Sequence, residues 1–261
     1  VIHLGHNRTA QDVVHAAICE DVHAVALSSY QGGHVEFFSY IRKLLDQLGG
    51  QDIRIFGGGG GVITIEEIEK LESHGITKIY SPEDGQYLTL DGIIGHMLFN
   101  SDRKITKWQK GSQNEGRWAR ALTLLENGEV TMDEAKKFIH KKSKSLRGHK
   151  PPILGVTGTG GAGKSSLVDE ILHRFLVDFE DIKIGVVCVD PSKKKTGGAL
   201  LGDRLRMNAC SDPRIFLRSF ASRQSGKELA QICQDAVNLL GSCDFDLIIV
   251  ETSGIGQGDT G

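Results

Sequence analysis

Short apolar runs alternate with amphipathic segments along the first hundred residues. The runs predict strands, and the segments, whose apolar residues recur at helical spacing, predict helices. The predicted strands cover residues 1–4, 22–27, 53–56 and 78–80. The predicted helices cover residues 10–21, 35–48, 65–73 and 88–99. Strands that alternate with helices favour a parallel sheet with helices on both faces, so residues 1–101 are predicted to form one α/β domain.

The same pattern returns after Pro151-Pro152, which marks a boundary. Strands at 153–157, 183–189 and 246–250 and helices at 165–179 and 227–240 predict a second α/β domain over residues 151–261. Between the two domains, residues 102–150 contain two amphipathic segments that are broken near Asn127-Gly128. These residues are therefore predicted to form a helical linker.

The linker is basic, with thirteen Lys and Arg against six Asp and Glu, a net charge of +7. The run at residues 141–144 is typical of a solvated helix end, and a nearby phosphate-rich ligand is the alternative. The chain as a whole has a net charge of −2, which argues against a nucleic-acid partner. No apolar run is long enough to predict a membrane-spanning helix, and residues 1–6 lack a signal-peptide pattern.

Cysteine and glycine usage narrows the class further. Five scattered cysteines without a Cys-x-x-Cys pair indicate the reduced thiols of a cytoplasmic protein instead of a disulfide frame or a zinc site. The 33 glycines among 261 residues come in clusters without a fixed period, which excludes a collagen-like chain. Such clusters indicate places where the backbone turns tightly or approaches a ligand closely.

The strongest motif in the chain is a glycine-rich octapeptide that matches G-x-x-x-x-G-K-[ST]. Its residues are Gly158-Thr159-Gly160-Gly161-Ala162-Gly163-Lys164-Ser165, and Ser166 follows. Glycines let backbone N–H groups curl around phosphate oxygens, and the positive N-terminus of the next predicted helix points at the same anion. We expect these residues to bind a nucleoside triphosphate, with Lys164 bridging its outer phosphates and the Ser165 hydroxyl ligating Mg²⁺.

The same segment also fits G-x-G-x-x-G, through Gly158, Gly160 and Gly163. A dinucleotide site would then use an acid at the end of the next strand, near Asp190. Lys164 and the serine after it place a charge and a hydroxyl where a dinucleotide-binding helix needs only tight packing. The pattern therefore favours the triphosphate.

Three acids are candidate Mg²⁺ ligands because each follows a strand end or a flexible loop. Glu251 ends the apolar strand at 246–250, and Asp190 follows the apolar run at 185–189. Asp203 follows a glycine-rich loop at 196–202, which is a candidate switch segment ordered by the triphosphate. For Asp190 or Asp203 taken alone, a turn or cap role is the alternative. The backbone N–H groups of residues 252–254 are candidate donors to a γ-phosphate.

Four motifs in this half resemble the G-protein chaperones of cobalamin-dependent acyl-CoA mutases. They are Val189-Asp190-Pro191-Ser192, Thr196-Gly197-Gly198, Leu201-Gly202-Asp203-Arg204 and Val250-Glu251-Thr252-Ser253-Gly254-Ile255-Gly256-Gln257. The resemblance covers residues 153–260 and implies a P-loop NTPase fold that hydrolyses GTP. It implies a Mg²⁺-nucleotide site made of Lys164, Ser165, Asp190, Asp203 and Glu251, with Lys164 and Glu251 as the catalytic residues. The chain lacks the guanine-specific Asn-Lys-x-Asp motif, so the preference for GTP over ATP follows from the resemblance alone.

In the first half, small residues at two strand ends predict a slot for a flat ligand, around residues 28–34 and 57–61. A generic flavodoxin-like domain shares this feature. However, Ser28-Ser29-Tyr30 and Gly60-Gly61-Val62-Ile63 are similar to the Ser-x-Leu and Gly-Gly elements of the cobalamin-binding domain of the same mutases, with tyrosine in place of leucine. The resemblance implies a flavodoxin-like (Rossmann-type) domain that binds adenosylcobalamin. The dimethylbenzimidazole tail of the cofactor would lie among five residues: Ser28, Ser29, Tyr30, Gly60 and Gly61.

The cobalt-ligating Asp-x-His-x-x-Gly motif of that family is missing from this chain. Asp21-Val22-His23 lacks the glycine and lies where a predicted helix runs into a predicted strand, so we interpret both residues as structural. The chain is therefore expected to start one β-α unit late. We hypothesise that it is an internal piece of a longer polypeptide.

Both domains in this order resemble the fused isobutyryl-CoA mutases. The resemblance implies the cofactor-and-chaperone part of an enzyme that isomerises isobutyryl-CoA to n-butyryl-CoA, with the acyl-CoA bound by a domain absent here. The G domain would gate cofactor loading, and we also expect a homodimer. One alternative is a methylmalonyl-CoA mutase-type paralogue. A second is a stand-alone GTPase that delivers nickel or zinc, against which the scattered cysteines argue. A third is a cobalamin- or light-sensing module, which would usually lack a fused G domain.

Overall fold

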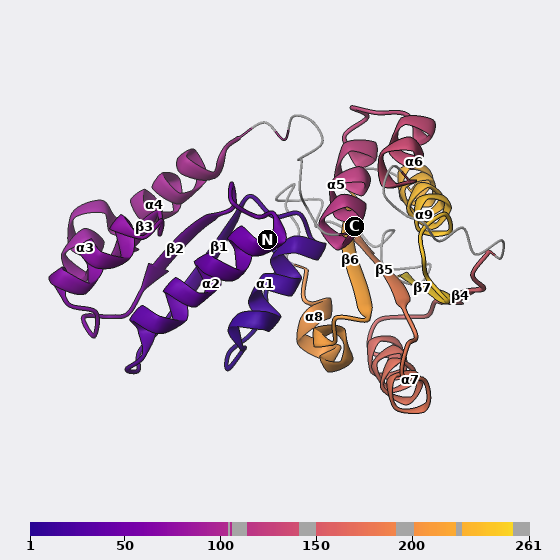
Figure 1. Ribbon diagram of the computed structural model, residues 1–261, viewed down its shortest axis with the longest axis horizontal. Coiled ribbons are helices and arrows are strands. Elements are labelled where there is room, and N and C mark those ends of the chain that lie inside the picture. Colours follow the sequence, from indigo (N-terminus) through magenta and orange to yellow (C-terminus); the bar gives the residue numbers. More distant parts are fainter. Residues whose placement is uncertain (104, 106–113, 141–149, 192–200, 223–225, 253–261) are drawn as a thin grey trace. The chain divides into compact units, whose positions relative to one another are not determined.

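The computed structural model describes residues 1–103, 105, 114–140, 150–191, 201–222 and 226–252 (Figure 1). Its contacts divide the chain into two compact units, each with its own parallel sheet. Unit 1 comprises residues 1–8 and 117–261, and unit 2 comprises residues 9–116. None of the helices in the described residues is long and apolar enough to cross a bilayer.

Unit 2 alternates helices and strands as the apolar pattern predicts. Its elements are α1 (Ala10–Cys19), β1 (Ala24–Ser28), α2 (His34–Leu48), β2 (Arg54–Gly58), α3 (Ile65–Ser73), β3 (Lys78–Tyr80) and α4 (Pro82–Ser101). The three parallel strands lie in the order β1-β2-β3. On one face of the sheet, Phe38 of α2 packs tightly on Gly57 of β2, and a Cβ added to Gly57 would lie 2.4 Å from the Phe38 ring. On the other, the Tyr80 hydroxyl lies 2.7 Å from Nδ1 of His96 on α4, so helices cover both faces.

Three helices of unit 2 begin with a capping box, in which an N-cap hydroxyl and the N3 carboxylate each accept a backbone N–H bond. The N-cap residues are Thr9, Thr64 and Ser81. The box at Ser81, followed by Pro82, starts α4 six residues before the predicted start at 88. Apolar periodicity misses this start because α4 has no buried residue and its helical geometry breaks at Thr89, whose φ is +60°.

Unit 1 contains a four-stranded parallel sheet in the order β4-β7-β5-β6. Its helices are α5 (Asn114–Glu126), α6 (Met132–His140), α7 (Lys164–Asp178), α8 (Asp203–Arg206), η1 (Asn208–Ser211) and α9 (Gly226–Leu240). Its strands are β4 (Ile153–Val156), β5 (Ile184–Pro191), β6 (Ile215–Ser222) and β7 (Leu247–Thr252). The helices expected between the two domains exist as α5 and α6.

The two faces of this sheet are covered by different helices, α7 on one and α5 with α9 on the other (Figure 1). Leu217 of β6 belongs to the same buried cluster as Leu172 of α7. Its neighbour Phe216 points the other way and meets Trp118 of α5, at a ring-centroid distance of 5.7 Å. Trp118 also contacts Phe245, at 4.7 Å. The helix α5 is therefore part of the core of unit 1.

Two strands differ from the expectation. The strand predicted at residues 1–4 is wrong, because only Ile2 pairs, in an isolated parallel bridge with Leu201 inside unit 1. Two hydrogen bonds, 3.0 and 2.9 Å long, hold that bridge. The sequence pattern also leaves β6 without a prediction, although its eight residues pair with β5 along their whole length. A short apolar run does not say which strand, if any, it will pair with, so long-range pairing decides both cases.

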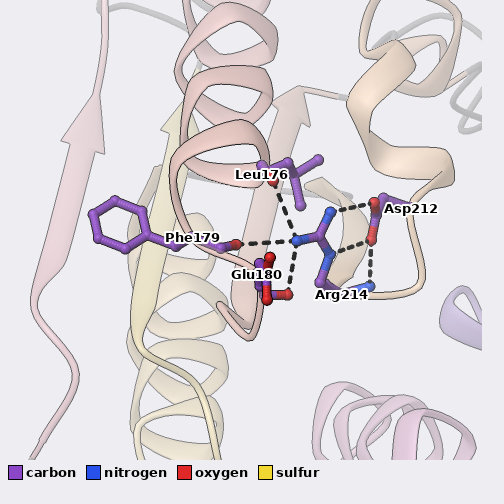
Figure 2. A network of polar contacts seen from close by, with 5 residues as sticks. All are labelled: Leu176, Phe179, Glu180, Asp212 and Arg214. Atoms are coloured by element: carbon purple, nitrogen blue, oxygen red, sulfur yellow. Dashed lines mark hydrogen bonds and ion pairs between the residues drawn. The ribbon is translucent and has the colours of Figure 1, made fainter.

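Arg214, just before β6, ties three segments of unit 1 together (Figure 2). Its guanidinium donates to both carboxylate oxygens of Asp212, at 2.9 and 2.8 Å. Its Nη1 donates to the carbonyls of Leu176, Phe179 and Glu180, at 3.3, 3.0 and 2.9 Å. Pairing with Asp212 raises the pKa of Arg214. Because the last carbonyls of a helix lack partners within it, Arg214 caps α7 at the end opposite the glycine-rich loop.

Candidate functional site

The glycine-rich loop connects β4 directly to α7, as the motif predicts. Gly161 and Gly163 have φ angles of +78° and +82°, a region that strains any other residue, and an added Cβ on either would meet nothing within 4 Å. Glycine is therefore needed for the turn itself and leaves the space around these two positions open. Gly160 and Ala162 lie in the same loop, and the Ala162 N–H donates to the Thr159 carbonyl at 3.3 Å.

The first turn of α7 is open to an anion. It begins after Gly163 with no side-chain cap and no acidic residue, so its N–H groups and the positive end of its dipole have no competing partner of that kind. Lys164 is its first residue, and its Nζ donates to the Thr159 carbonyl at 3.1 Å. The lysine thus lies over the loop, where a phosphate oxygen could replace that carbonyl.

Ser165 and Glu251 meet at the carboxyl edge of the sheet, although 86 positions separate them in the sequence. Glu251 lies in β7, whose neighbour on one side is β4, with Glu251 opposite Val156. The Ser165 hydroxyl donates to Oε1 of Glu251 at 2.8 Å, and both residues are buried, with 9% and 7% of their surfaces exposed. The other carboxylate oxygen, Oε2, is buried and has no hydrogen-bond partner in the described part of the chain. An orphaned carboxylate oxygen beside a hydroxyl is the donor chemistry that Mg²⁺ prefers, so these residues fit that ion.

For the other residues predicted at this site, the structure shows the strand or helix on which each lies. Asp190 lies in β5, and its backbone pairs with Ala221, but its side chain is outside the described part. Asp203 is half-buried and begins α8, which packs against α7. Ser166 is exposed on α7. The predicted switch loop falls mostly on residues 192–200, and the predicted γ-phosphate donors at 253–254 follow; both lie outside the described residues.

In unit 2, the residues predicted around the tail of cobalamin gather at the carboxyl edge of the sheet. Ser28 is the last residue of β1. The Ser29 N–H donates to the Gly58 carbonyl at 2.9 Å, and an added Cβ on Gly59 would lie 2.5 Å from the Ser29 carbonyl oxygen. The loops that follow β1 and β2 therefore touch each other.

Tyr30 continues this contact. An added Cβ on Gly60 would lie 2.8 Å from the Tyr30 ring, whereas Tyr30 itself is 71% exposed. Gly60 and Gly61 have φ angles of +57° and +91°, which only glycine adopts readily. We define the slot loops as residues 29–33 and 59–64. Tyr30, Gly60 and Gly61 are exposed at this edge of the sheet, so a ligand could reach the surface of these loops.

Residues 118–261 match the family model described as "Methylmalonyl Co-A mutase-associated GTPase MeaB". The match covers more than half of the chain and contains the glycine-rich loop, the Ser165–Glu251 contact and all four strands of unit 1. The chain belongs to the MeaB family of GTPases. Unit 1 accordingly has the P-loop NTPase fold of MeaB proteins, as predicted, whereas unit 2 lies outside the MeaB match.

Two longer proteins are similar in sequence to this chain over both of its units. The fused isobutyryl-CoA mutase of Cupriavidus metallidurans is 49% identical over an alignment of 266 positions, which covers 99% of this chain and 24% of that protein. The fused isobutyryl-CoA mutase of Geobacillus kaustophilus is 48% identical over 99% of this chain and 25% of its own length. The GTPase ArgK of Escherichia coli is 39% identical over 41% of this chain and 32% of its own. The resemblance to fused isobutyryl-CoA mutases is confirmed, and the chain spans about a quarter of the length of these two relatives.

The structure puts Asp21 and His23 away from the slot loops. Both lie between α1 and β1, at the amino end of that strand, and the His23 carbonyl accepts the Arg54 N–H at 3.1 Å. Their interpretation as structural residues is consistent with this position. In the described ranges, no three His, Cys, Asp or Glu residues are grouped so that they could hold a metal ion.

Sequence reasoning overlooks one polar pair beside the slot loops. His34, the first residue of α2, is only 6% exposed, and its Nε2 lies 3.0 Å from Oε2 of Glu67 on α3. The N–H of Thr64, and next His34, hold the pKa of Glu67 below its ordinary value. The Thr64-x-x-Glu67 spacing predicts the capping box of α3. No local sequence pattern predicts that His34, thirty-three residues earlier, contacts Glu67.

Proposed function

We propose that unit 1 binds and hydrolyses GTP with Mg²⁺ at the loop formed by residues 158–165. The Ser165–Glu251 hydrogen bond carries this proposal, because it places a hydroxyl and a carboxylate beside the phosphate-binding loop. The open glycine turn and the uncapped start of α7 would hold the phosphates through backbone N–H groups. Lys164 would leave the Thr159 carbonyl and neutralise the outer phosphates.

Ser165 and Glu251 would hold Mg²⁺, which neutralises the charge that develops on the phosphate oxygens. The serine hydroxyl has one proton, and donating it to Glu251 turns the oxygen lone pairs away from that carboxylate. The hydrogen bond therefore orients Ser165 as a ligand. Asp190 and Asp203, at the ends of neighbouring segments, are the candidates for completing the ion's shell.

The proposal is tested by Lys164→Ala in the intact chain, with binding of a non-hydrolysable GTP analogue measured by isothermal titration in Mg²⁺. Losing the lysine that lies over the loop should abolish measurable binding. Lys183→Ala is the matched control, because Lys183 pairs with Asp244 at 3.5 Å near the amino end of β5, the opposite edge of the sheet. Nucleotide affinity that is the same in both variants would refute the phosphate assignment. Repeating the titration with ATP decides whether the preference is for guanine.

We further propose that unit 2 binds the nucleotide tail of adenosylcobalamin between the slot loops, with Ser28, Ser29, Tyr30, Gly60 and Gly61 as its contacts. The exposure of Ser28, Tyr30, Gly60 and Gly61 at the carboxyl edge of the sheet supports this, because it leaves their surface open to a planar group. The cofactor supplies the radical chemistry of a mutase when bound. A shift in the visible absorption of adenosylcobalamin on mixing with the chain is the test, and an unchanged spectrum at millimolar protein would contradict it. Lys164→Ala should leave this spectral shift unchanged.

In the whole protein, we propose that this chain is the cofactor-binding and chaperone part of an isobutyryl-CoA mutase. The 48–49% identity to fused isobutyryl-CoA mutases over both units supports this role. Acyl-CoA would bind to a part of the polypeptide outside this sequence, and GTP hydrolysis in unit 1 would gate loading of the cofactor. An isomerisation assay of the full-length product with isobutyryl-CoA tests the activity, and n-butyryl-CoA is the expected product. Its absence from a cobalamin-loaded enzyme would favour a methylmalonyl-CoA mutase-type paralogue. Size-exclusion chromatography with light scattering tests the proposed homodimer.

A further inference from the structure

The contact between His34 and Glu67 joins the ends of the two slot loops. His34 immediately follows the first slot loop, at the start of α2, and Glu67 lies in the first turn of α3, just after the second. The distance from Nε2 to Oε2 is 3.0 Å. This side-chain contact therefore joins the starts of the two helices, which also pack against each other.

Both nitrogens of the His34 ring face acceptors. Nδ1 lies 3.3 Å from the carbonyl oxygen of Gln31, within the first slot loop, and Nε2 faces the Glu67 carboxylate. A ring nitrogen that carries a proton can donate to the acceptor that it faces, and the tautomer decides which nitrogen that is. Because His34 is only 6% exposed, its ring is held by the surrounding packing as well as by these two contacts.

Glu67 is itself fixed from the other side. Its Oε2 accepts the Thr64 N–H at 2.9 Å, and its own N–H donates to the Thr64 hydroxyl at 3.3 Å. The carboxylate therefore belongs to the capping box of α3 as well as to the contact with His34. Movement of Thr64, the last residue of the second slot loop, would therefore disturb both contacts of Glu67.

We propose that His34 and Glu67 form a clasp that holds the slot loops in their binding geometry before the cofactor tail arrives. Both are positioning residues, since neither is among the predicted tail contacts. The inference rests on the cobalamin-binding function proposed above and adds the residues that preorganise its site. Without the clasp, the loops would have to be ordered during binding, and that ordering weakens affinity.

The experiment compares two corrinoids on the intact chain. Adenosylcobalamin carries the nucleotide tail, and dicyanocobinamide has the corrin ring without it. Equilibrium dialysis with visible absorption measures both dissociation constants. His34→Ala should weaken adenosylcobalamin binding by about three- to tenfold, the range for ordering about one side chain on binding. Binding of dicyanocobinamide should not change, which a merely structural role for His34 would not predict.

Two further variants separate the clasp from the helix cap. Glu67→Gln keeps an oxygen for the Thr64 N–H but removes the charge that faces His34, so it should weaken tail-dependent binding less than His34→Ala. Glu66→Gln removes the neighbouring exposed charge of the same helix turn and should have no effect. A double variant of His34→Ala and Glu67→Gln should bind no more weakly than His34→Ala alone, because both break one contact. Circular dichroism and thermal melting check that each variant folds. If His34→Ala does not fold, Glu67→Gln is compared with the unaltered chain in its place.

The outcomes distinguish the two proposals. If the unaltered chain binds both corrinoids equally or binds neither, the tail-binding function fails and the clasp fails with it. If the unaltered chain prefers adenosylcobalamin and the His34 and Glu67 variants keep the full preference, the clasp is overturned while the function stands.

Discussion

Glu251→Gln should change the stability of the protein and its affinity for Mg²⁺-nucleotide in opposite directions. Glu251 is 7% exposed, accepts one hydrogen bond from Ser165, and has a buried Oε2 without a hydrogen-bond partner among the described residues. Glutamine has nearly the same shape and keeps an oxygen for the serine, but it is neutral. The substitution therefore removes a buried charge without creating a cavity.

The magnitude follows from three contributions. Desolvating a buried ion costs several kcal/mol, against about 1–3 kcal/mol for a neutral polar group that lacks a partner. The difference of about 2 kcal/mol is offset by about 1 kcal/mol, because a neutral acceptor makes a weaker bond to Ser165. The free energy of unfolding without ligand should therefore rise by about 1 kcal/mol. For a unit of this size, that raises the Tm by about 2–4 °C.

Thermal unfolding followed by circular dichroism, with and without Mg²⁺ and a GTP analogue, measures both effects. The unaltered protein should gain stability from Mg²⁺-nucleotide, and Glu251→Gln should lose most of that gain, with affinity at least about tenfold weaker. Glu170→Gln, on the exposed face of α7, is the control and should leave both the Tm and the gain nearly unchanged. A ligand-free Glu251→Gln protein that melts below the unaltered one, or that keeps the full Mg²⁺-dependent gain, would refute the reasoning.

Three further predictions test the two cores and one cap. Trp118→Ala should lower the free energy of unfolding of unit 1 by about 3–5 kcal/mol in a denaturant titration, because its ring is 7% exposed in the aromatic cluster under α5; an effect below 1 kcal/mol would show that α5 is not part of that core. Gly57→Ala should destabilise unit 2 by about 1–3 kcal/mol, since its Cβ would lie 2.4 Å from the Phe38 ring, and Gly57→Ala combined with Phe38→Leu should recover part of the loss. The Thr64 N–H is the main group that holds the pKa of Glu67 below 4.5, so the ionised carboxylate should stabilise α3 above that pH and lose this effect as the pH falls through the lowered pKa of the folded state. The Tm, measured from about pH 6 to 3, should therefore fall less steeply in Glu67→Gln than in the unaltered protein. Equal slopes would contradict this prediction.

Much of the site could be predicted because its parts are local. The positive φ of Gly161 and Gly163, the helix that starts at Lys164 and the hydroxyl at Ser165 all lie within one turn of chain. The alternation of strands and helices also predicted both parallel sheets. Periodicity failed where its signal was absent or ambiguous, as in α4, whose exposed apolar residues do not face a core.

By itself, the sequence determined what short-range hydrogen bonds and steric preferences decide: the phosphate-binding turn, the capping boxes and the order of strands and helices along the chain. Only the tertiary structure decided which distant groups meet. Glu251 reaches Ser165 because β7 is inserted between β4 and β5. His34 likewise meets Glu67 only because α2 and α3 pack together in unit 2. Strand order and helix packing depend on burying the apolar faces of sheets and helices against each other. The fit between these faces involves many residues from distant segments, so no single segment predicts it.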